Sequence, residues 1–208
     1  MKIMDKVFAR FLEKFGEPTD RQEVPASSIE RYTGKLPDQL LEYWDEHGWC
    51  GYGGGIFWLV NPQDYDGVIA SWIEGTKFES FDSYHLIARS AFGDLYLWGE
   101  KTAASLKITS LASRYITHTS ILPESMMDKR LRNFLLSTEI EYNDYDNLFK
   151  PARKKLGTLR HDEMYGFVPA LMLGGPDNLQ HLEKVKAVEH LMLLSQITGL
   201  QSYSFSDI

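Results

Sequence analysis

The chain is poor in cysteine and in long apolar runs. Its 208 residues include one cysteine, Cys50, so no disulfide can form within the chain, which slightly favours a reducing compartment. No apolar run approaches the ~20 residues that a membrane-spanning helix needs. The first residues, MKIMDKVFARFLEKFG, carry charges throughout and lack the apolar core and cleavage site of a secretory signal. We therefore predict a soluble cytoplasmic protein without a membrane partner.

Phosphate-binding and dinucleotide-binding fingerprints are also missing. The glycine cluster GWCGYGGG (residues 48–55) could surround a phosphate, but a P-loop continues with Gly-Lys-Ser/Thr, and here Ile56 and Phe57 follow. We interpret the cluster as a tight connection between a helix and a strand. The sequence contains no nucleophile elbow either.

Candidate nucleophiles and metal ligands do not form complete sets. Cys50 follows His47 by three residues without a third group to orient the base, so we interpret it as a buried structural thiol. His181 and His190 fall on opposite faces of a predicted helix, and consecutive residues of a strand, such as those of His161-Asp162-Glu163, point to alternating sides. We predict no metal, no cofactor and no catalytic residue.

Two D-x-D pairs keep one enzymatic alternative open. Asp64 with Asp66, or Asp144 with Asp146, could hold a magnesium ion. Such pairs are common by chance, and we interpret them as solvated turn carboxylates. A metal-dependent enzyme would show tight divalent-ion binding and would lose activity when Asp64 or Asp144 is replaced.

The apolar pattern predicts an α+β protein with a mixed, largely antiparallel sheet flanked by helices, and a helical C-terminal region. Met4 to Phe15 have helical spacing, Ser27 and Glu30 form a capping box, and Pro37 starts a further helix. Strands are predicted at IFWLV, YHLIARS, DLYLWG, SLKIT and SRYITHT, with a turn and helix in NPQDYDGVIASWIEG.

The C-terminal half has a more helical pattern. A helix beginning near Pro123 has an apolar inner face, and YGFVPALML is predicted as a strand in which Pro169 favours a sheet edge or a bulge. Asp177 is predicted to cap a last helix, whose apolar residues repeat every three or so positions from Leu179 to Ile197. We place a soft boundary near residue 110, with residues 1–110 and 111–208 as two domains or as parts of one core.

Charge points to a protein partner of opposite sign. The formal net charge is −7, whereas a protein that binds nucleic acid directly is usually basic. The segment EIEYNDYD combines carboxylates with tyrosines, the rigid anchors of many interfaces, at Glu139, Glu141, Tyr142, Asp144, Tyr145 and Asp146. The alternative is a polar connection whose tyrosines enter the core. The basic run that follows, Lys150 to Arg160, is interpreted as a solvated helix face.

The stretch HDEMYGFVPALMLGG (residues 161–175) raises a similar choice. We interpret its apolar part as a strand with its turn. Four polar residues at its beginning are expected to be exposed and available to a partner, namely His161, Asp162, Glu163 and Tyr165.

Three stretches together resemble a known group. FDSYHLIARSAFGDLYLWGE, LPDQLLEYWDEHGWCGYGGGIFWLVNPQDY and DEMYGFVPALMLGG are similar to bacterial type VI secretion immunity proteins, which join a GAD-like region to a C-terminal immunity domain. The first half also resembles the SUKH immunity superfamily. The likeness extends from about Phe8 to Leu200, and these residues match the C-terminal signature: Phe149, Leu156, Gly157, Asp162, Glu163, Tyr165, Gly166, Phe167, Pro169, Gly174 and Gly175.

This resemblance implies a non-catalytic α+β protein, with residues 1–110 as a GAD-like or SUKH-like domain and residues 111–208 as an immunity domain. It implies tight binding in the cytoplasm to a co-secreted DNase toxin, whose nuclease domain is expected to be basic. Separately, we expect the protein to be a monomer. The nine acidic and tyrosine residues of segments 139–146 and 162–165 are the expected toxin contacts. A regulatory or scaffold protein of the SUKH-like type, with another partner, is the alternative.

Overall fold

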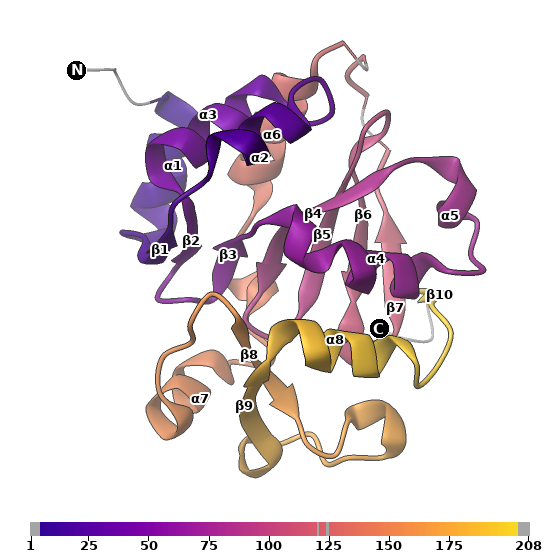
Figure 1. The fold of residues 1–208 in the computed structure, drawn as a ribbon. Helices are drawn as coiled ribbons and strands as arrows, with labels where there is room; N and C mark the ends of the chain where they lie inside the picture. The colour runs from indigo at the N-terminus through magenta and orange to yellow at the C-terminus, as the bar shows by residue number, and fades with distance from the viewer. Residues whose placement is uncertain (1–4, 120, 124, 204–208) are drawn as a thin grey trace.

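The chain forms one large sheet with helices on both faces and a small two-stranded ribbon (Figure 1). The computed structural model describes residues 5–119, 121–123 and 125–203. Figure 1 shows α4 (Asp66–Ile73) and α8 (Ala187–Ser195) in front of the sheet and α6 (Met127–Ser137) behind it. The predicted α+β class and the largely antiparallel sheet are confirmed.

The large sheet has the order β1-β2-β3-β4-β5-β6-β7-β10, and all neighbouring pairs are antiparallel except β7 with β10. The four strands from β4 to β7 form a meander, and their predicted positions are confirmed. The bounds are β1 (Thr19–Gln22), β2 (Trp49–Tyr52), β3 (Phe57–Leu59), β4 (Tyr84–Ser90), β5 (Asp94–Gly99), β6 (Ala103–Thr109), β7 (Arg114–Thr117) and β10 (Gln201–Ser202).

The helices begin and end largely where the apolar spacing predicts. Asp5 caps α1 by accepting a hydrogen bond from the Val7 backbone N–H at 3.0 Å, and the helix ends at Gly16, whose φ of 78° suits glycine. Met4, the first residue of the predicted stripe, lies outside the described residues. Besides α4, α6 and α8, the α-helices of the described chain are α1 (Lys6–Phe15), α2 (Ala26–Tyr32), α3 (Asp38–His47), α5 (Phe78–Phe81) and α7 (Phe149–Leu156).

Buried residues from both halves of the chain belong to one hydrophobic cluster. Phe134 of α6 lies 5.6 Å from Tyr96 of β5 and 6.4 Å from Phe57 of β3, measured between ring centroids. The sheet itself continues past residue 110 through β7. The division into two domains near residue 110 stays a prediction, and the two parts pack through shared aromatic contacts.

The segment before Ala26 contains β1, a strand that was not predicted, which pairs with β2 at the edge of the sheet. Two expectations for the N-terminal part were wrong. The glycine cluster is not only a connection, because Trp49–Tyr52 forms β2 and the glycines after it make the turn to β3. Ser27 is no cap, since α2 already begins at Ala26 and Pro25 occupies the capping position.

The predicted last helix is half strand. Leu179–His181 forms a short 3-10 helix, Leu182–Lys186 forms β9, and only Ala187–Ser195 is α-helical. Strand β8 (Glu163–Phe167) needs a hydrogen-bonding neighbour, and β9 pairs with it antiparallel from Glu163↔Lys186 to Phe167↔Leu182. That distant pairing overrides the helical periodicity.

The predicted strand YGFVPALML is also shorter than expected. It ends at Phe167, a cis peptide bond precedes Pro169, and Leu171–Leu173 forms a 3-10 turn. Asp177 caps no helix, and instead its Oδ2 accepts a hydrogen bond from the Tyr145 hydroxyl at 2.9 Å.

The imidazole of His190 is enclosed between α8 and β8. His190 is 8% exposed, and its Nε2 has no hydrogen-bond partner within the described chain. A Cβ placed on Gly166 would lie 2.6 Å from that nitrogen, so only glycine fits beneath the ring. Burial lowers the pKa of His190, because the charged form loses its hydration.

His190 should therefore make stability depend on pH. The unfolded chain binds a proton near pH 6.5 while the folded chain resists it, so this contribution is complete above that pH and is lost as the pH falls. Between pH 7.5 and 5.5 we expect up to about 1.4 kcal/mol of lost unfolding free energy from this residue. Urea titrations should show a smaller loss in His190→Gln, and an unchanged pH dependence would contradict the assignment.

Candidate functional site

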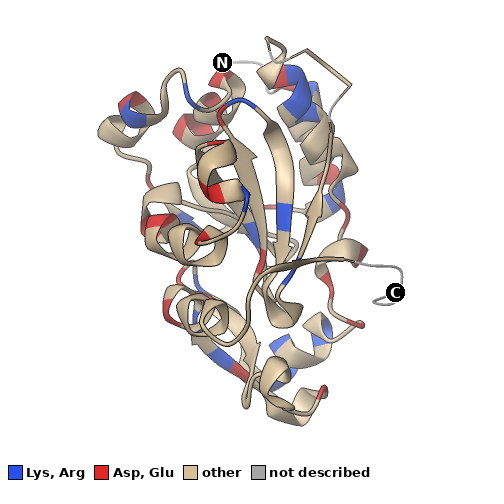
Figure 2. Ribbon diagram, turned by 90° about the vertical axis from the view of Figure 1, so that its right-hand side faces the viewer, with Lys and Arg blue, Asp and Glu red and all other residues tan. Residues whose placement is uncertain are grey.

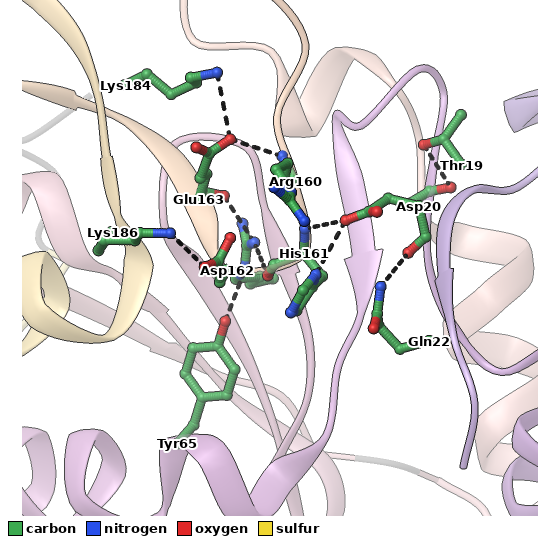
Figure 3. A network of polar contacts seen from close by, with 12 residues as sticks. Thr19, Asp20, Gln22, Tyr65, Arg160, His161, Asp162, Glu163, Lys184 and Lys186 are labelled. Atoms are coloured by element: carbon green, nitrogen blue, oxygen red, sulfur yellow. Dashed lines mark hydrogen bonds and ion pairs between the residues drawn. The ribbon is translucent and has the colours of Figure 1, made fainter.

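Arg89 of β4 holds the loop at the beginning of β8. Its Nη2 donates hydrogen bonds to the backbone carbonyls of His161 and Glu163, both at 2.8 Å, and its Nε donates to the Tyr65 hydroxyl at 3.0 Å (Figure 3). The guanidinium carbon lies 5.2 Å from the ring centroid of Trp58. One side chain of the N-terminal part thus fixes a backbone segment of the C-terminal part.

Arg89 is fully buried, at 0% exposure, and no carboxylate within the described ranges forms an ion pair with it. Its charge is stabilised by carbonyl and hydroxyl oxygens and by the face of Trp58. A buried guanidinium is costly unless its donors are satisfied, so the acceptors must stay in place. The conformation of residues 161–163 is therefore tightly defined.

The three polar side chains of this loop are all engaged (Figure 3). Asp20 Oδ2 accepts hydrogen bonds from the His161 backbone N–H at 2.6 Å and from its ring Nδ1 at 3.1 Å. Asp162 pairs with Lys186, an interaction that lowers the pKa of Asp162. Glu163 pairs with Lys184 at 3.4 Å. Asp162 and Glu163 are ion-pair partners with side-chain exposures of 42% and 16%, and they are not isolated surface carboxylates.

The expected exposure of Tyr165 is wrong. Its side chain is 0% exposed, and its hydroxyl donates a hydrogen bond to the Gly157 carbonyl at 2.6 Å. Burial raises its pKa to about 12. The residue lies inside β8, whose residues from Met164 to Phe167 are all buried, and its ring packs against Phe92 and Phe149. It cannot contact a partner in this conformation.

A cleft of about 420 Å³ opens beside the loop, between the two parts of the chain. Trp49, Asn61, Asp64 and Tyr65 from the first part are among the residues that line it. Its other lining residues come from both parts: Gln22, Leu59, Val60, His161, Asp162, Lys186, Val188 and Glu189. Partial burial raises the pKa of Asp64. The carboxylates of Asp64, Asp162 and Glu189 make the wall of the cleft rich in hydrogen-bond acceptors.

The acidic-aromatic segment forms a second surface, behind the sheet with α6. Here Asn143, which is 3% exposed, accepts a hydrogen bond from the Tyr96 hydroxyl at 2.9 Å and donates to the Glu139 carbonyl at 2.7 Å. Asp144 Oδ1 accepts the Phe149 backbone N–H at 2.8 Å at the start of α7. These bonds fix the segment to β5 and α7.

The side chains of this segment divide into inward and outward groups. Glu139 pairs with Lys14 at 2.7 Å, and the Tyr145 ring packs 5.4 Å from that of Phe167. Glu141, Tyr142 and Asp146 are exposed, with Tyr142 at 70%. Each of the two interpretations of the tyrosines therefore holds for one of them: Tyr145 enters the core, and Tyr142 faces solvent.

Tyr142 stands at the edge of a groove of about 580 Å³ between α6 and the sheet. Phe134, Tyr96 and Leu106 line its interior, and Ile116, which is 40% exposed, lines it as well. The Lys107 ammonium in the groove is neutralised by Asp94 at 2.7 Å. The groove therefore offers an apolar surface next to exposed carboxylates.

The nine expected contact residues do not form one surface. The 139–146 segment lies with α6 behind the sheet, while the 161–163 loop and the cleft involve η1 (Pro62–Tyr65) and α8 in front (Figure 1). Figure 2 shows acidic and basic residues distributed over many helices, so the net charge is not confined to one face. The 139–146 segment and the 161–163 loop therefore belong to two separate surfaces.

The D-x-D pairs and Cys50 have structural partners. Asp66 pairs with Arg31 at 3.5 Å, and Asp144 caps α7. Cys50 donates to the His47 carbonyl at 2.9 Å, and burial raises the pKa of its thiol. No cluster of three or more His, Cys, Asp or Glu side chains suited to a metal ion occurs in the parts of the chain that the structure describes.

The basic run has the expected exposed helix face. Arg153, Lys154 and Lys155 are exposed on α7, and Lys155 donates to the carbonyls of Leu179 and Gln180. His181 and His190 do not share a helix, because His181 ends the 3-10 turn before β9. Within residues 5–203, apart from the two undescribed positions, no helix is long and apolar enough to cross a membrane.

Comparison with known proteins identifies first a shared fold and then a family. The fold is shared with the crystal structure of Atu4351 from Agrobacterium tumefaciens, with a TM-score of 0.84 and 21% identity over 99% of this chain and 96% of that one. Residues 6–112 match the GAD-like domain model, so the chain belongs to the GAD-like domain family. Curated proteins gave no match.

The remainder of the chain matches a second family. Residues 128–198 match the C-terminal domain of the type VI secretion immunity protein Tdi1. The two matches together support a type VI secretion immunity protein with a toxin-neutralising function. The resemblance found in the sequence is confirmed at this level.

Sequence reasoning missed Arg89, Asn143 and Asp20. Arg89 was included in a predicted strand, YHLIARS, where a lone charge among apolar residues reads as an outward position. Its place next to Leu86, Ile87 and Ala88 in the sequence does not show that its side chain is buried.

Replacing Arg89 should strongly destabilise the protein. Arg89→Met replaces the guanidinium with an unbranched apolar side chain and leaves two buried carbonyls and the Tyr65 hydroxyl without their donor. We therefore expect a loss of about 3 kcal/mol of unfolding free energy. Arg31→Met is the matched control, since Arg31 and its partner Asp66 each keep 51% side-chain exposure, and it should cost less than about 1 kcal/mol. Equal losses in urea unfolding would contradict the role of Arg89.

Proposed function

We propose that this protein binds a secreted DNase and neutralises it in the cytoplasm of the cell that produces both. The observation that carries the proposal is the immunity-domain match over residues 128–198, which contains the exposed acidic-aromatic segment. A DNase must present cationic side chains to the DNA phosphates. An acidic surface with an aromatic anchor is complementary to such a site.

The proposed contact surface consists of Glu141, Tyr142 and Asp146, together with the groove beside Tyr142. These three side chains are exposed and take part in no ion pair that the structure records. An aromatic or aliphatic side chain of the toxin would enter the groove, while its flanking cations meet the carboxylates. Bound there, the immunity protein would cover the surface on which the toxin holds DNA.

Three further residues of the segment would act by positioning this surface. Glu139 is tied to Lys14, Asp144 caps α7, and Tyr145 packs on Phe167. Substituting Asp144 would therefore disturb α7 as well as the surface charge. Asp162 and Glu163 remain proposed contacts only for a partner that reaches the front face.

The direct test is co-expression with the toxin encoded beside this gene, followed by co-purification. We expect survival of the cells and a stable complex with a dissociation constant at or below about 1 nM, which corresponds to roughly 12 kcal/mol. Cell death, or survival without a complex, would exclude direct inhibition.

A triple variant should locate the binding face. Glu141→Gln/Tyr142→Ala/Asp146→Asn removes two charges and the anchor, while asparagine tolerates the φ of 46° at position 146. We expect at least a ~30-fold weaker complex, since one buried tyrosine anchor alone contributes about 2 kcal/mol. Glu30→Gln/Glu74→Gln, which removes two exposed carboxylates elsewhere, is the control for net charge and should change affinity little. Equal effects of both variants would reject this surface.

A further inference from the structure

The cleft between the two parts of the chain has an unusual excess of hydrogen-bond acceptors. Three carboxylates line it, from Asp64, Asp162 and Glu189, against one ammonium, that of Lys186. Lys186 is already paired with Asp162. Asp64 receives one hydrogen bond from the Asn61 amide at 3.0 Å, and Glu189 is exposed on the first turn of α8. The cleft therefore keeps a net negative charge.

His161 adds another acceptor to the same wall. Asp20 Oδ2 binds both the backbone N–H and the ring Nδ1 of His161. When the imidazole is neutral, this contact places its proton on Nδ1 and leaves Nε2 as an acceptor. Figure 3 shows the ring between Asp20 and the side of the cleft that Tyr65 occupies.

Two buried polar atoms of the lining residues have no partner. Trp49 is 8% exposed, and its indole Nε1 donates no hydrogen bond in the described structure. The Oδ1 atom of Asp162 is buried and accepts none. Each unpaired buried group destabilises the free protein, and a ligand with matching groups would remove this cost. The Trp49 N–H is independent of the acidic character of the cleft and also indicates a ligand.

From this lining we infer that the cleft binds an arginine side chain presented by a partner polypeptide. A guanidinium offers five N–H donors in one plane, which suits several carboxylates and an imidazole nitrogen that approach from different sides. A backbone carbonyl of the same segment would accept the Trp49 N–H.

Other cations fit the cleft less well. A lysine ammonium has three donors at one point and no flat face. A calcium ion requires six to eight oxygens around one centre, and the described residues supply no metal-binding cluster here. The site lies in front of the sheet, away from the α6 surface, so it is additional to the proposed toxin contact.

The inference can be tested on the isolated protein by following the tryptophan indole N–H signals in ¹⁵N NMR spectra. The five tryptophans give five such signals, and Trp49→Phe assigns the relevant one. The probe is N-acetyl-arginine methylamide, and its matched control is the citrulline analogue, which has nearly the same shape without the charge. The protein variants are Asp64→Asn/Glu189→Gln and, as the control, Glu30→Gln/Glu74→Gln.

We expect a saturable shift of the Trp49 signal with the arginine probe and none with citrulline. The affinity should fall at least ~10-fold in Asp64→Asn/Glu189→Gln and stay unchanged in the control variant, with the other four indole signals unmoved as evidence of an intact fold. No saturable shift, an equal shift with citrulline, or unchanged affinity in the cleft variant would overturn the inference. Because no toxin takes part, these results are independent of the immunity function.

Discussion

The buried guanidinium of Arg89 is the constraint on which the arrangement of both parts depends. It reaches from β4 to the carbonyls of His161 and Glu163, and Tyr65 and Trp58 complete its surroundings. Because no carboxylate neutralises it in the described chain, its stability depends on keeping these oxygens within hydrogen-bond distance. The β8 loop is thereby placed against the GAD-like part, and the cleft acquires fixed walls.

Behind the sheet, a network of hydrogen bonds has the corresponding role. The hydrogen bond between Tyr96 and Asn143 joins β5 to the acidic-aromatic segment. Asp144 of the same segment accepts the first backbone N–H of α7, that of Phe149. The exposed side chains of Glu141 and Tyr142 are therefore carried on a backbone that is held from both sides. A binding surface of this kind loses little conformational entropy on association, which favours tight inhibition.

Local patterns predicted the meander from β4 to β7 and helices α1, α3 and α4, because alternation, turn residues and caps act over a few residues. Strand β9 could not be predicted this way, since its partner β8 decides its conformation and the apolar spacing alone fits a helix. The acidic-aromatic segment was found from composition, but the inward direction of Tyr145 and the burial of Tyr165 depend on distant packing. Arg89 gave no local signal, because its acceptors lie about seventy residues further along the chain.

The most direct test of the account is hydrogen–deuterium exchange of the protein alone and in its complex with the toxin. The account predicts slower exchange in residues 139–147 and in the groove strands β6 and β7, while α2 and α3 exchange as they do in the free protein. Protection restricted to α2, α3 or the β1 edge, with residues 139–147 unchanged, would contradict the proposed binding surface.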